Sequence, residues 1–142
     1  MPDFNSNVIE QFRNNDGKVG PPFEGAPMVL VHHLGAKSGT ERVTPLVYLP
    51  DGDRIAIFAS AAGAPSNPDW YHNLKAHPRV TVDVGDGKGT VETWTAEATE
   101  VTGAERDALY ARQAAIMPGF AEYEVKTEGI RTIPVITLTR AG

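Results

Sequence analysis

The segment from Gly35 to Leu46 contains the side chains best suited to holding a ligand in this chain. It places two cations, Lys37 and Arg42, among hydroxyl groups and glycines, between two apolar and β-branched runs. Glycine lets the backbone turn sharply and approach a ligand closely, and arginine can hold an oxyanion through two parallel hydrogen bonds. The segment therefore predicts a local site for a phosphate or a carboxylate, with a simple polar hairpin tip as the alternative. It is not a Walker A loop, because Ala36 precedes the lysine and no helix is expected to follow.

A second candidate region begins where a predicted strand ends, at Ala59. Small residues continue to Ala64, and backbone amides along such a run can approach a flat ligand. Asn67-Pro68 then predicts a helix start, with a capping Asn and Pro at the first helical position. The N-terminus of that helix adds free N–H groups and partial positive charge. Trp70 can stack on a ring and Asn73 can reach its polar edge, whereas the alternative is that Trp70 only seals the core.

The remaining polar residues do not predict a metal site or a nucleophile with its base. His32 and His33 are adjacent on a predicted strand, so their side chains should point to opposite faces. His72 and His77 have poor spacing for chelation on a short helix, and no Ser-His-Asp arrangement can be assigned. A bound cofactor that carries the chemistry is therefore the better hypothesis.

Composition limits the classes of function. The chain has 142 residues, a net charge of −5 and no cysteine. This length predicts one domain, residues 1–142, with residues 1–26 as an N-terminal helix and lead-in. The acidic balance argues against nucleic acid as a partner, because phosphate backbones require a broad basic face. The lack of cysteine excludes disulfides, thiolate catalysis and sulfur-bound metals.

The sequence also bears on location. The start of the chain lacks the basic and apolar regions of a signal peptide. No run of about 18 apolar residues occurs, so no transmembrane segment is expected. We expect a cytoplasmic protein, which is compatible with peripheral contact with a membrane surface.

Hydrophobic periodicity and turn residues predict mainly strands. Strands are expected at residues 28–34, 43–49, 54–59, 79–84, 90–101 and 132–139, and helices at 7–14, 68–77 and 103–116. Thr102 and Glu105 read as a capping box for the last of these helices, and the segment after Pro118 is expected to be a mobile loop. Six strands with few helices favour an α+β fold, a small antiparallel barrel with helices outside it.

Together these motifs resemble the deazaflavin-dependent nitroreductase family. The likeness covers nearly the whole chain and is carried by residues 35–39, 42–46, 60–64, 67–78 and 131–135. It implies a split β-barrel of about six antiparallel strands with flanking helices. It also implies coenzyme F420 as cofactor and an F420-dependent reductase that passes a hydride to a small quinone, enone or nitroaromatic acceptor.

The resemblance further implies a role for each motif. The loop cations and its serine would hold the phosphate and glutamate tail, Thr44 and Pro45 would line the ring, and backbone groups after the third strand would meet the pyrimidine edge. The implied cofactor contacts are Lys37, Ser38, Arg42, Thr44, Pro45, Ala59, Ser60, Ala61, Ala62, Asn67, Trp70 and Asn73. Two residues depart from the family pattern, because Ala61 stands where a lysine is common and Asp69 where an apolar residue is common.

Tyr123 is the candidate catalytic residue. By the resemblance, its segment covers the acceptor side of the ring, and a phenol can donate a hydrogen bond to the acceptor as negative charge develops. Simple packing of Tyr123 is the alternative. Two other functions remain open: an FMN-dependent split-barrel enzyme, and a carrier that binds F420 without catalysis. The expected assembly is a monomer or a homodimer.

Overall fold

The computed structural model describes residues 4–20 and 25–141, so parts of the predicted lead-in lie outside the described residues. The helices are α1 (Phe4–Asn14), α2 (Asp69–Ala76), α3 (Gly103–Ile116) and α4 (Gly119–Thr127), with a short 3-10 helix, η1 (Ala61–Gly63). The strands are β1 (Met28–Leu34), β2 (Glu41–Val47), β3 (Leu49–Asp51), β4 (Arg54–Phe58), β5 (Arg79–Gly85), β6 (Val91–Val101) and β7 (Val135–Arg140).

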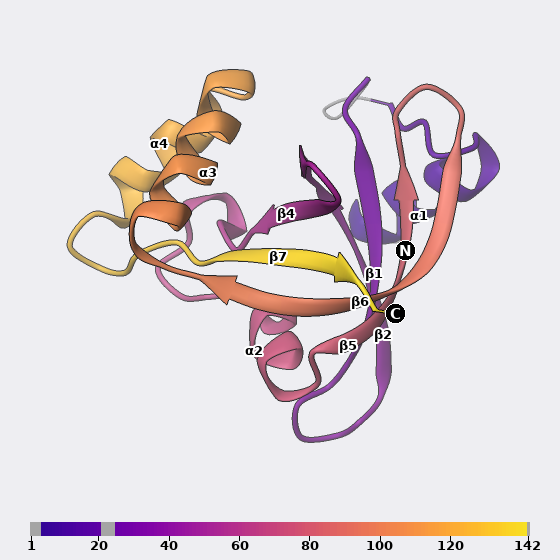
Figure 1. The fold of residues 1–142 in the computed structure, drawn as a ribbon, viewed down its shortest axis with the longest axis horizontal. Coiled ribbons are helices and arrows are strands. Elements are labelled where there is room, and N and C mark those ends of the chain that lie inside the picture. The colour runs from indigo at the N-terminus through magenta and orange to yellow at the C-terminus, as the bar shows by residue number, and fades with distance from the viewer. Residues whose placement is uncertain (1–3, 21–24, 142) are drawn as a thin grey trace.

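The seven strands form one curled sheet in the order β2-β1-β5-β6-β7-β4-β3, and each neighbouring pair is antiparallel. The expected α+β split barrel is confirmed (Figure 1). The sheet has seven strands where about six were expected, because the predicted strand 43–49 divides at Tyr48. There the Tyr48 N–H donates to Pro27 O at 3.3 Å and its hydroxyl donates to Gly85 O at 3.1 Å. The chain therefore leaves β1 as a partner and pairs with β4 instead.

Alternating side chains of the strands give the sheet two apolar faces. The inner face, with Val29, Val31 and Ile57, packs around Trp70 and Leu74 of α2. On the outer face, α1 packs against Met28 and Leu30 of β1, while α3 and α4 cover Phe58 and Val135 at the far end of the sheet. Figure 1 shows α3 and α4 together on one side of the molecule and α1 on the other.

Long-range contacts correct two predicted helix caps. Asn67 does not cap α2, which begins at Asp69 with Pro68 at the N-cap position and without a side-chain cap. The Asn67 side chain instead accepts a hydrogen bond from Arg131 at 2.8 Å. Thr102 likewise makes no capping hydrogen bond, and Glu105 pairs with Arg54 at 2.7 Å instead.

The segment after Pro118 is a helix, α4, rather than the expected loop. Its first turn is fixed by the buried side chain of Phe120, whose carbonyl accepts a 2.6 Å hydrogen bond from the Tyr110 hydroxyl of α3. Two other element bounds also differ from expectation. Helix α1 begins at Phe4 rather than at residue 7, and β7 begins at Val135, after Pro134 rather than before it.

None of the helices among the described residues is long and apolar enough to cross a membrane. The cytoplasmic location expected from the sequence stays a prediction.

Candidate functional site

The loop between β1 and β2, residues 35–40, is shaped mainly by its own hydrogen bonds. Gly35 N–H donates to Thr40 O and Gly39 N–H donates to Gly35 O, both at 2.9 Å. Ser38 Oγ accepts from the Thr40 N–H at 3.2 Å and lies so close to Gly35 that a Cβ there would overlap it. A larger residue at position 35 would therefore force the Ser38 hydroxyl to shift and would compete with its hydrogen bond to Thr40.

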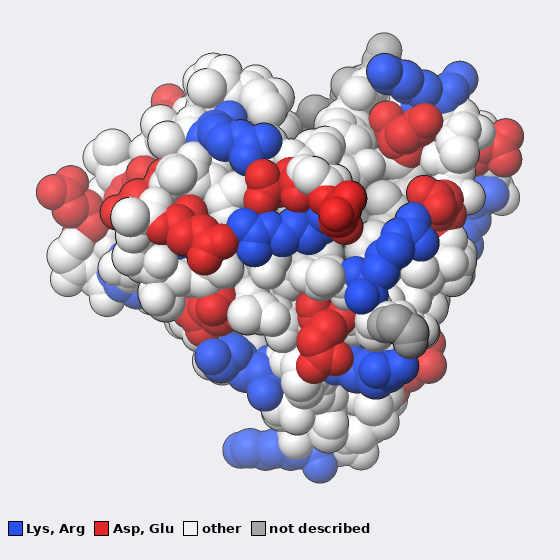
Figure 2. Space-filling view, in the orientation of Figure 1, with Lys and Arg blue, Asp and Glu red and all other residues white. Residues whose placement is uncertain are grey.

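The two cations of this region, Lys37 and Arg42, are exposed. Neither forms an ion pair within the part of the chain that the structure describes. In Figure 2 a basic group protrudes at the lower tip of the molecule, over the β1–β2 loop, without an acidic neighbour on the visible face. Cations that no carboxylate occupies are available to a phosphate or carboxylate ligand.

The loop is connected to α2 by a buried polar chain. Asn73 Oδ1 accepts the N–H of Ala36 at 2.9 Å, and Asn73 Nδ2 lies 2.9 Å from His33 Nδ1. His33 Nε2 in turn lies 2.8 Å from Thr44 Oγ1. Burial lowers the pKa of His33, the nearby charges of Arg42 and His32 lower it further, and only Asp69 opposes them. The predicted ring contact by Asn73 thus falls on an amide whose two ends already have partners.

Strand alternation separates two of the predicted ring contacts. In β2, Thr44 lies opposite Val31 and shares the inner face of the sheet with Arg42, whereas Pro45 shares the outer face, beneath α1, with Val43. The side chains of Thr44 and Pro45 therefore point to opposite faces. As predicted, His32 and His33 also diverge, since His32 bonds Asp83 at 2.8 Å on the other side of the strand.

Trp70 is buried in the inner core beside Leu74, with 6% of its surface exposed. This is the environment that the packing alternative expected for it. Little of the indole surface can reach a ligand from such a position, while the proposed stacking on a ring needs a free face.

The small-residue segment, residues 59–67, is held by Arg131. Its guanidinium donates to the carbonyl oxygens of Ala59 and Ala64 at 3.0 Å, to that of Ser60 at 2.9 Å, and to Asn67 Oδ1 at 2.8 Å. Sequence reasoning placed Arg131 in a recognised motif but gave it no role. The available signal was an arginine two residues before the buried run that begins at Ile133, a place where a solvated cation is not expected.

This clamp leaves the other side of the backbone available. The N–H groups of Ser60, Ala61 and Ala62 have no hydrogen-bond partner among the described residues. Ala61 has a φ of 46°, a left-handed conformation that costs a residue with a Cβ about 1–2 kcal/mol. A strained run of free N–H groups at a strand end suits an oxygen acceptor of a flat ligand, as the sequence predicted for this segment.

Helix α4 packs directly against η1 in this segment. A Cβ at Gly63 would lie 3.0 Å from Lys126 Cδ, so the lysine stem covers the glycine. Tyr123 is half-buried on the same helix, with its ring centroid 5.3 Å from that of Phe120. The structure therefore brings the helix of Tyr123 beside residues 61–63, and it also packs the tyrosine ring.

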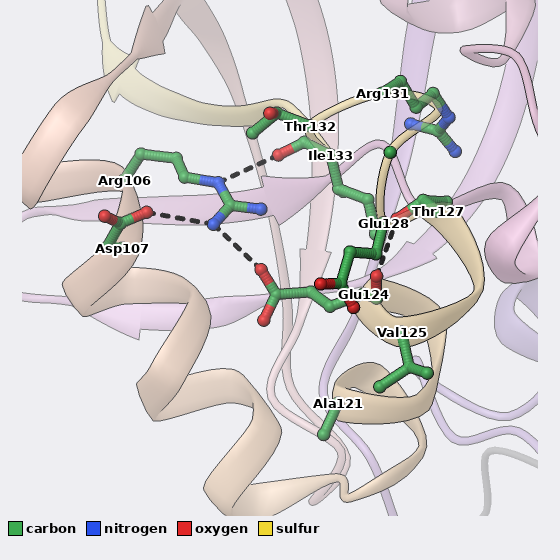
Figure 3. Close-up of a pocket in the computed structure, with 11 residues that line it drawn as sticks. Arg106, Asp107, Ala121, Glu124, Val125, Thr127, Glu128, Arg131, Thr132 and Ile133 are labelled. Atoms are coloured by element: carbon green, nitrogen blue, oxygen red, sulfur yellow. Dashed lines mark hydrogen bonds and ion pairs between the residues drawn. The ribbon is translucent and has the colours of Figure 1, made fainter.

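A hollow of about 480 Å³ lies on another side of α4 (Figure 3). Arg106 and Glu124 point toward one another across it, and Arg106 bonds both Glu124 Oε2 and Ile133 O at 3.0 Å. No predicted cofactor contact lines this hollow. This ion pair, between the buried Arg106 and the exposed Glu124, joins α3 and α4 and thereby helps to position α4 over the small-residue segment.

The predicted contacts thus form two groups, connected by α2. Lys37, Arg42 and Thr44 lie around the β1–β2 loop, and residues 59–64 lie under α4. In the described part of the chain, no group of three or more His, Asp or Glu side chains could hold a metal ion.

The split barrel, a loop with two exposed cations and a run of small residues at a strand end are together typical of flavin- and deazaflavin-dependent oxidoreductases. Residues 6–140 match the model of the F420H(2)-dependent quinone reductase family. The chain belongs to this family. It is an oxidoreductase, and coenzyme F420 is its cofactor, which confirms the class and the cofactor expected from the sequence.

Individual relatives agree with this assignment. An F420H(2)-dependent quinone reductase of Mycobacterium tuberculosis is 38% identical over 135 residues, which cover 91% of this chain and 85% of the relative. The solved structure of an F420-H2 dependent reductase, FDR-A, is 37% identical, with a TM-score of 0.67, over 78% of this chain and 92% of that chain. A second structure, described as a domain-swapped dimer, is 35% identical, with a TM-score of 0.68, over 92% of this chain and 90% of that one.

Proposed function

We propose that this protein reduces a small quinone with a hydride from reduced F420. The observation that carries the proposal is the small-residue segment, whose carbonyls bind Arg131 while the N–H groups of residues 60–62 remain available beside α4. That arrangement supplies a rigid polar edge for a planar ring and an adjacent helix to cover it.

The residues present fit the cofactor. Lys37 and Arg42 are exposed cations without carboxylate partners among the described residues, which suits a phosphate and a polyglutamate tail. The free N–H groups of residues 60–62 would donate to oxygens at the pyrimidine edge, and Thr44 would meet the ring from the inner face of β2. Ser38, Asn67, Trp70 and Asn73 remain in the proposed site chiefly as residues that shape its walls, whereas the Pro45 side chain points to the outer face of β2.

F420 supplies the two-electron hydride chemistry when it is bound. The protein then has to orient the acceptor, exclude water and deliver at most one proton. Tyr123 is the proposed donor, because its helix packs beside residues 61–63. Its hydroxyl forms no hydrogen bond among the described residues, so it remains available to the acceptor oxygen.

A quinone is the first choice of acceptor because the family and the M. tuberculosis relative carry that name. Enones and nitroaromatics are the further candidates, since each accepts a hydride at a position activated by an electron-withdrawing group. We further propose a homodimer, in line with the related structure described as a domain-swapped dimer, with a monomer as the alternative.

The test is steady-state oxidation of reduced F420 with menadione, cyclohexenone and a nitrobenzene, beside a binding titration with F420 and FMN. We expect tighter binding of F420 than of FMN and fastest turnover with menadione. Tighter binding of FMN would favour the FMN-dependent alternative. Binding of F420 without turnover of any acceptor would favour a carrier.

A further inference from the structure

The polar chain beneath the β1–β2 loop has a direction that the structure determines. It begins at the backbone N–H of Ala36, which donates to Asn73 Oδ1 at 2.9 Å. A backbone N–H can only donate, so the oxygen of the Asn73 amide must face it. The amide nitrogen consequently faces His33, 2.9 Å from Nδ1.

The tautomer of His33 follows from this orientation. Asn73 Nδ2 carries two hydrogens and cannot accept, so His33 Nδ1 must be the acceptor and carry no proton. The single proton of the neutral ring then lies on Nε2, which donates to Thr44 Oγ1 at 2.8 Å. The other neutral tautomer and the doubly protonated ring would both set an N–H against the Asn73 amide hydrogens.

The surroundings of His33 agree with a neutral ring. His33 has 2% of its surface exposed and Asn73 has 6%. Burial lowers the pKa of His33, as do the charges of Arg42 and His32, and the opposing charge of Asp69 does not reverse the direction. The hydrogen bonds between Asn73, His33 and Thr44 therefore keep the same direction at neutral pH.

Thr44 is the last residue of the hydrogen-bonded series that runs from Ala36 through Asn73 and His33. Because its oxygen accepts from His33, its own proton must point elsewhere, and no acceptor for it occurs among the described residues. Thr44 is half-buried on the inner face of β2, an edge strand of the sheet, two residues from Arg42. The hydroxyl proton thus points into the region beside the proposed phosphate-binding cation.

We propose that His33 is a positioning residue that, through its tautomer, presents the Thr44 hydroxyl as a hydrogen-bond donor to an acceptor atom of the bound deazaflavin ring. The same hydrogen bonds connect the β1–β2 loop to α2. The Thr44 hydroxyl, which would contact the ring, and the loop, which would contact the phosphate, are therefore held in a fixed relative position. The identity of the ring rests on the proposed function, whereas the tautomer belongs to the free protein.

The first experiment measures the ¹⁵N chemical shifts of the His33 ring by NMR in the free protein at neutral pH, with His33→Gln to assign the signals. We expect the Nε2–H tautomer. A ring protonated on Nδ1, alone or together with Nε2, would overturn the inference whether or not F420 binds.

The second experiment measures F420 affinity in Thr44 variants by binding titration. Thr44→Val removes the donor at nearly constant shape and should weaken binding about 5–10-fold, whereas Thr44→Ser should keep it within about twofold. Thr93→Val is the matched control, because the Thr93 hydroxyl bonds Asp83 at 2.7 Å on an exposed part of the sheet. Equal affinity of Thr44→Val and the unchanged protein would overturn the proposed donor.

A double-mutant cycle separates positioning from simple packing. In a His33→Leu background the hydroxyl loses its fixed direction, so Thr44→Val should cost about twofold or less there. The same 5–10-fold loss in both backgrounds would show that His33 does not act through Thr44. If His33→Leu does not fold, the NMR tautomer and the Thr44 variants still decide. Failure of the unchanged protein to bind F420 would instead overturn the proposed function.

Discussion

The β1–β2 loop and the small-residue segment are both short runs of small and polar residues, yet they are stabilised differently. The loop closes on itself through hydrogen bonds within residues 35–40 and reaches the rest of the protein through Asn73. The small-residue segment depends on Arg131, which is 64–72 residues away in the sequence from the groups it binds. A loop that supplies charge tolerates some freedom, whereas a platform for a planar ring needs its backbone fixed.

The two regions also differ in strain. The left-handed position of the loop is a glycine, Gly39, with φ 68°, whereas that of the small-residue segment is Ala61, with φ 46°. Glycine adopts such angles without a Cβ penalty, and alanine does not. Strain of this kind persists only where surrounding contacts enforce it, and Arg131 supplies those contacts.

The largest expected effect is that of Arg131→Ala. Removing the guanidinium leaves the carbonyls of Ala59, Ser60 and Ala64 without their partner, so the free energy of unfolding should fall by about 2–4 kcal/mol. F420 affinity should fall about 100-fold or more, because the N–H groups lose their fixed direction. Urea denaturation and a binding titration check both values.

Arg54→Ala is the matched control for this variant. Arg54 is likewise an arginine with hydrogen-bond partners, here Asp51 at 2.8 Å and Glu105 at 2.7 Å, but its side chain is 30% exposed. Such surface pairs contribute about 0–1 kcal/mol. Equal destabilisation by the two variants would contradict the special role of Arg131. Arg131→Lys should fall between them in stability, because an ammonium cannot reach all of these acceptors at once.

The second largest effect concerns the loop. Arg42→Ala should weaken F420 binding by about 1.5–3 kcal/mol, the usual contribution of a hydrogen bond between charged groups, with no loss of thermal stability. The weakening should shrink as salt is added, since the exposed charge is screened. Calorimetric titration measures it. Arg79→Ala, which removes another exposed cation, on β5, should bind F420 normally. Unchanged affinity in Arg42→Ala would show that the loop does not bind the cofactor's anionic groups.

Features set by neighbours in the sequence could be predicted from it. Alternation gave the sheet strands within a few residues, and the glycines and cations of residues 35–42 indicated a polar hairpin loop. The opposed directions of His32 and His33 follow from strand geometry alone. The assignment of ligand groups to the loop is still a prediction, since charge and spacing do not specify the ligand.

Features set by distant partners could not be predicted. Asn67 and Glu105 are residue types that commonly cap helices, but their side chains accept hydrogen bonds from Arg131 and Arg54 instead. A Pro-Gly pair such as the one before Phe120 usually ends a helix. Here a second helix, α4, forms at once, because Phe120 packs against α3. Each outcome depends on an arginine or an aromatic residue elsewhere in the chain, whose position in space sequence patterns do not reveal.

Tyr123→Phe tests the small-residue segment from the acceptor side, because α4 packs against η1. Loss of one hydrogen-bond donor should lower kcat/KM for quinones about 10–100-fold. F420 affinity should stay within about twofold, and the ring packing against Phe120 should keep stability unchanged. Steady-state kinetics with menadione check this. Full activity would reduce Tyr123 to a packing residue and leave proton delivery to water.

The smallest expected effects come from exchanging the left-handed residues of the two regions. Gly39→Ala adds a Cβ that meets no atom within 4 Å, so only backbone strain acts, partly offset by a stiffer unfolded chain. We expect it to lower the free energy of unfolding by about 0.5–1 kcal/mol. Ala61→Gly removes an exposed methyl and its strain, and should raise that free energy by about 0.5 kcal/mol while weakening F420 binding a few-fold. Urea denaturation of both variants gives the signs. A loss of stability in Ala61→Gly would mean that the methyl group, and not the enforced backbone, stabilises the segment.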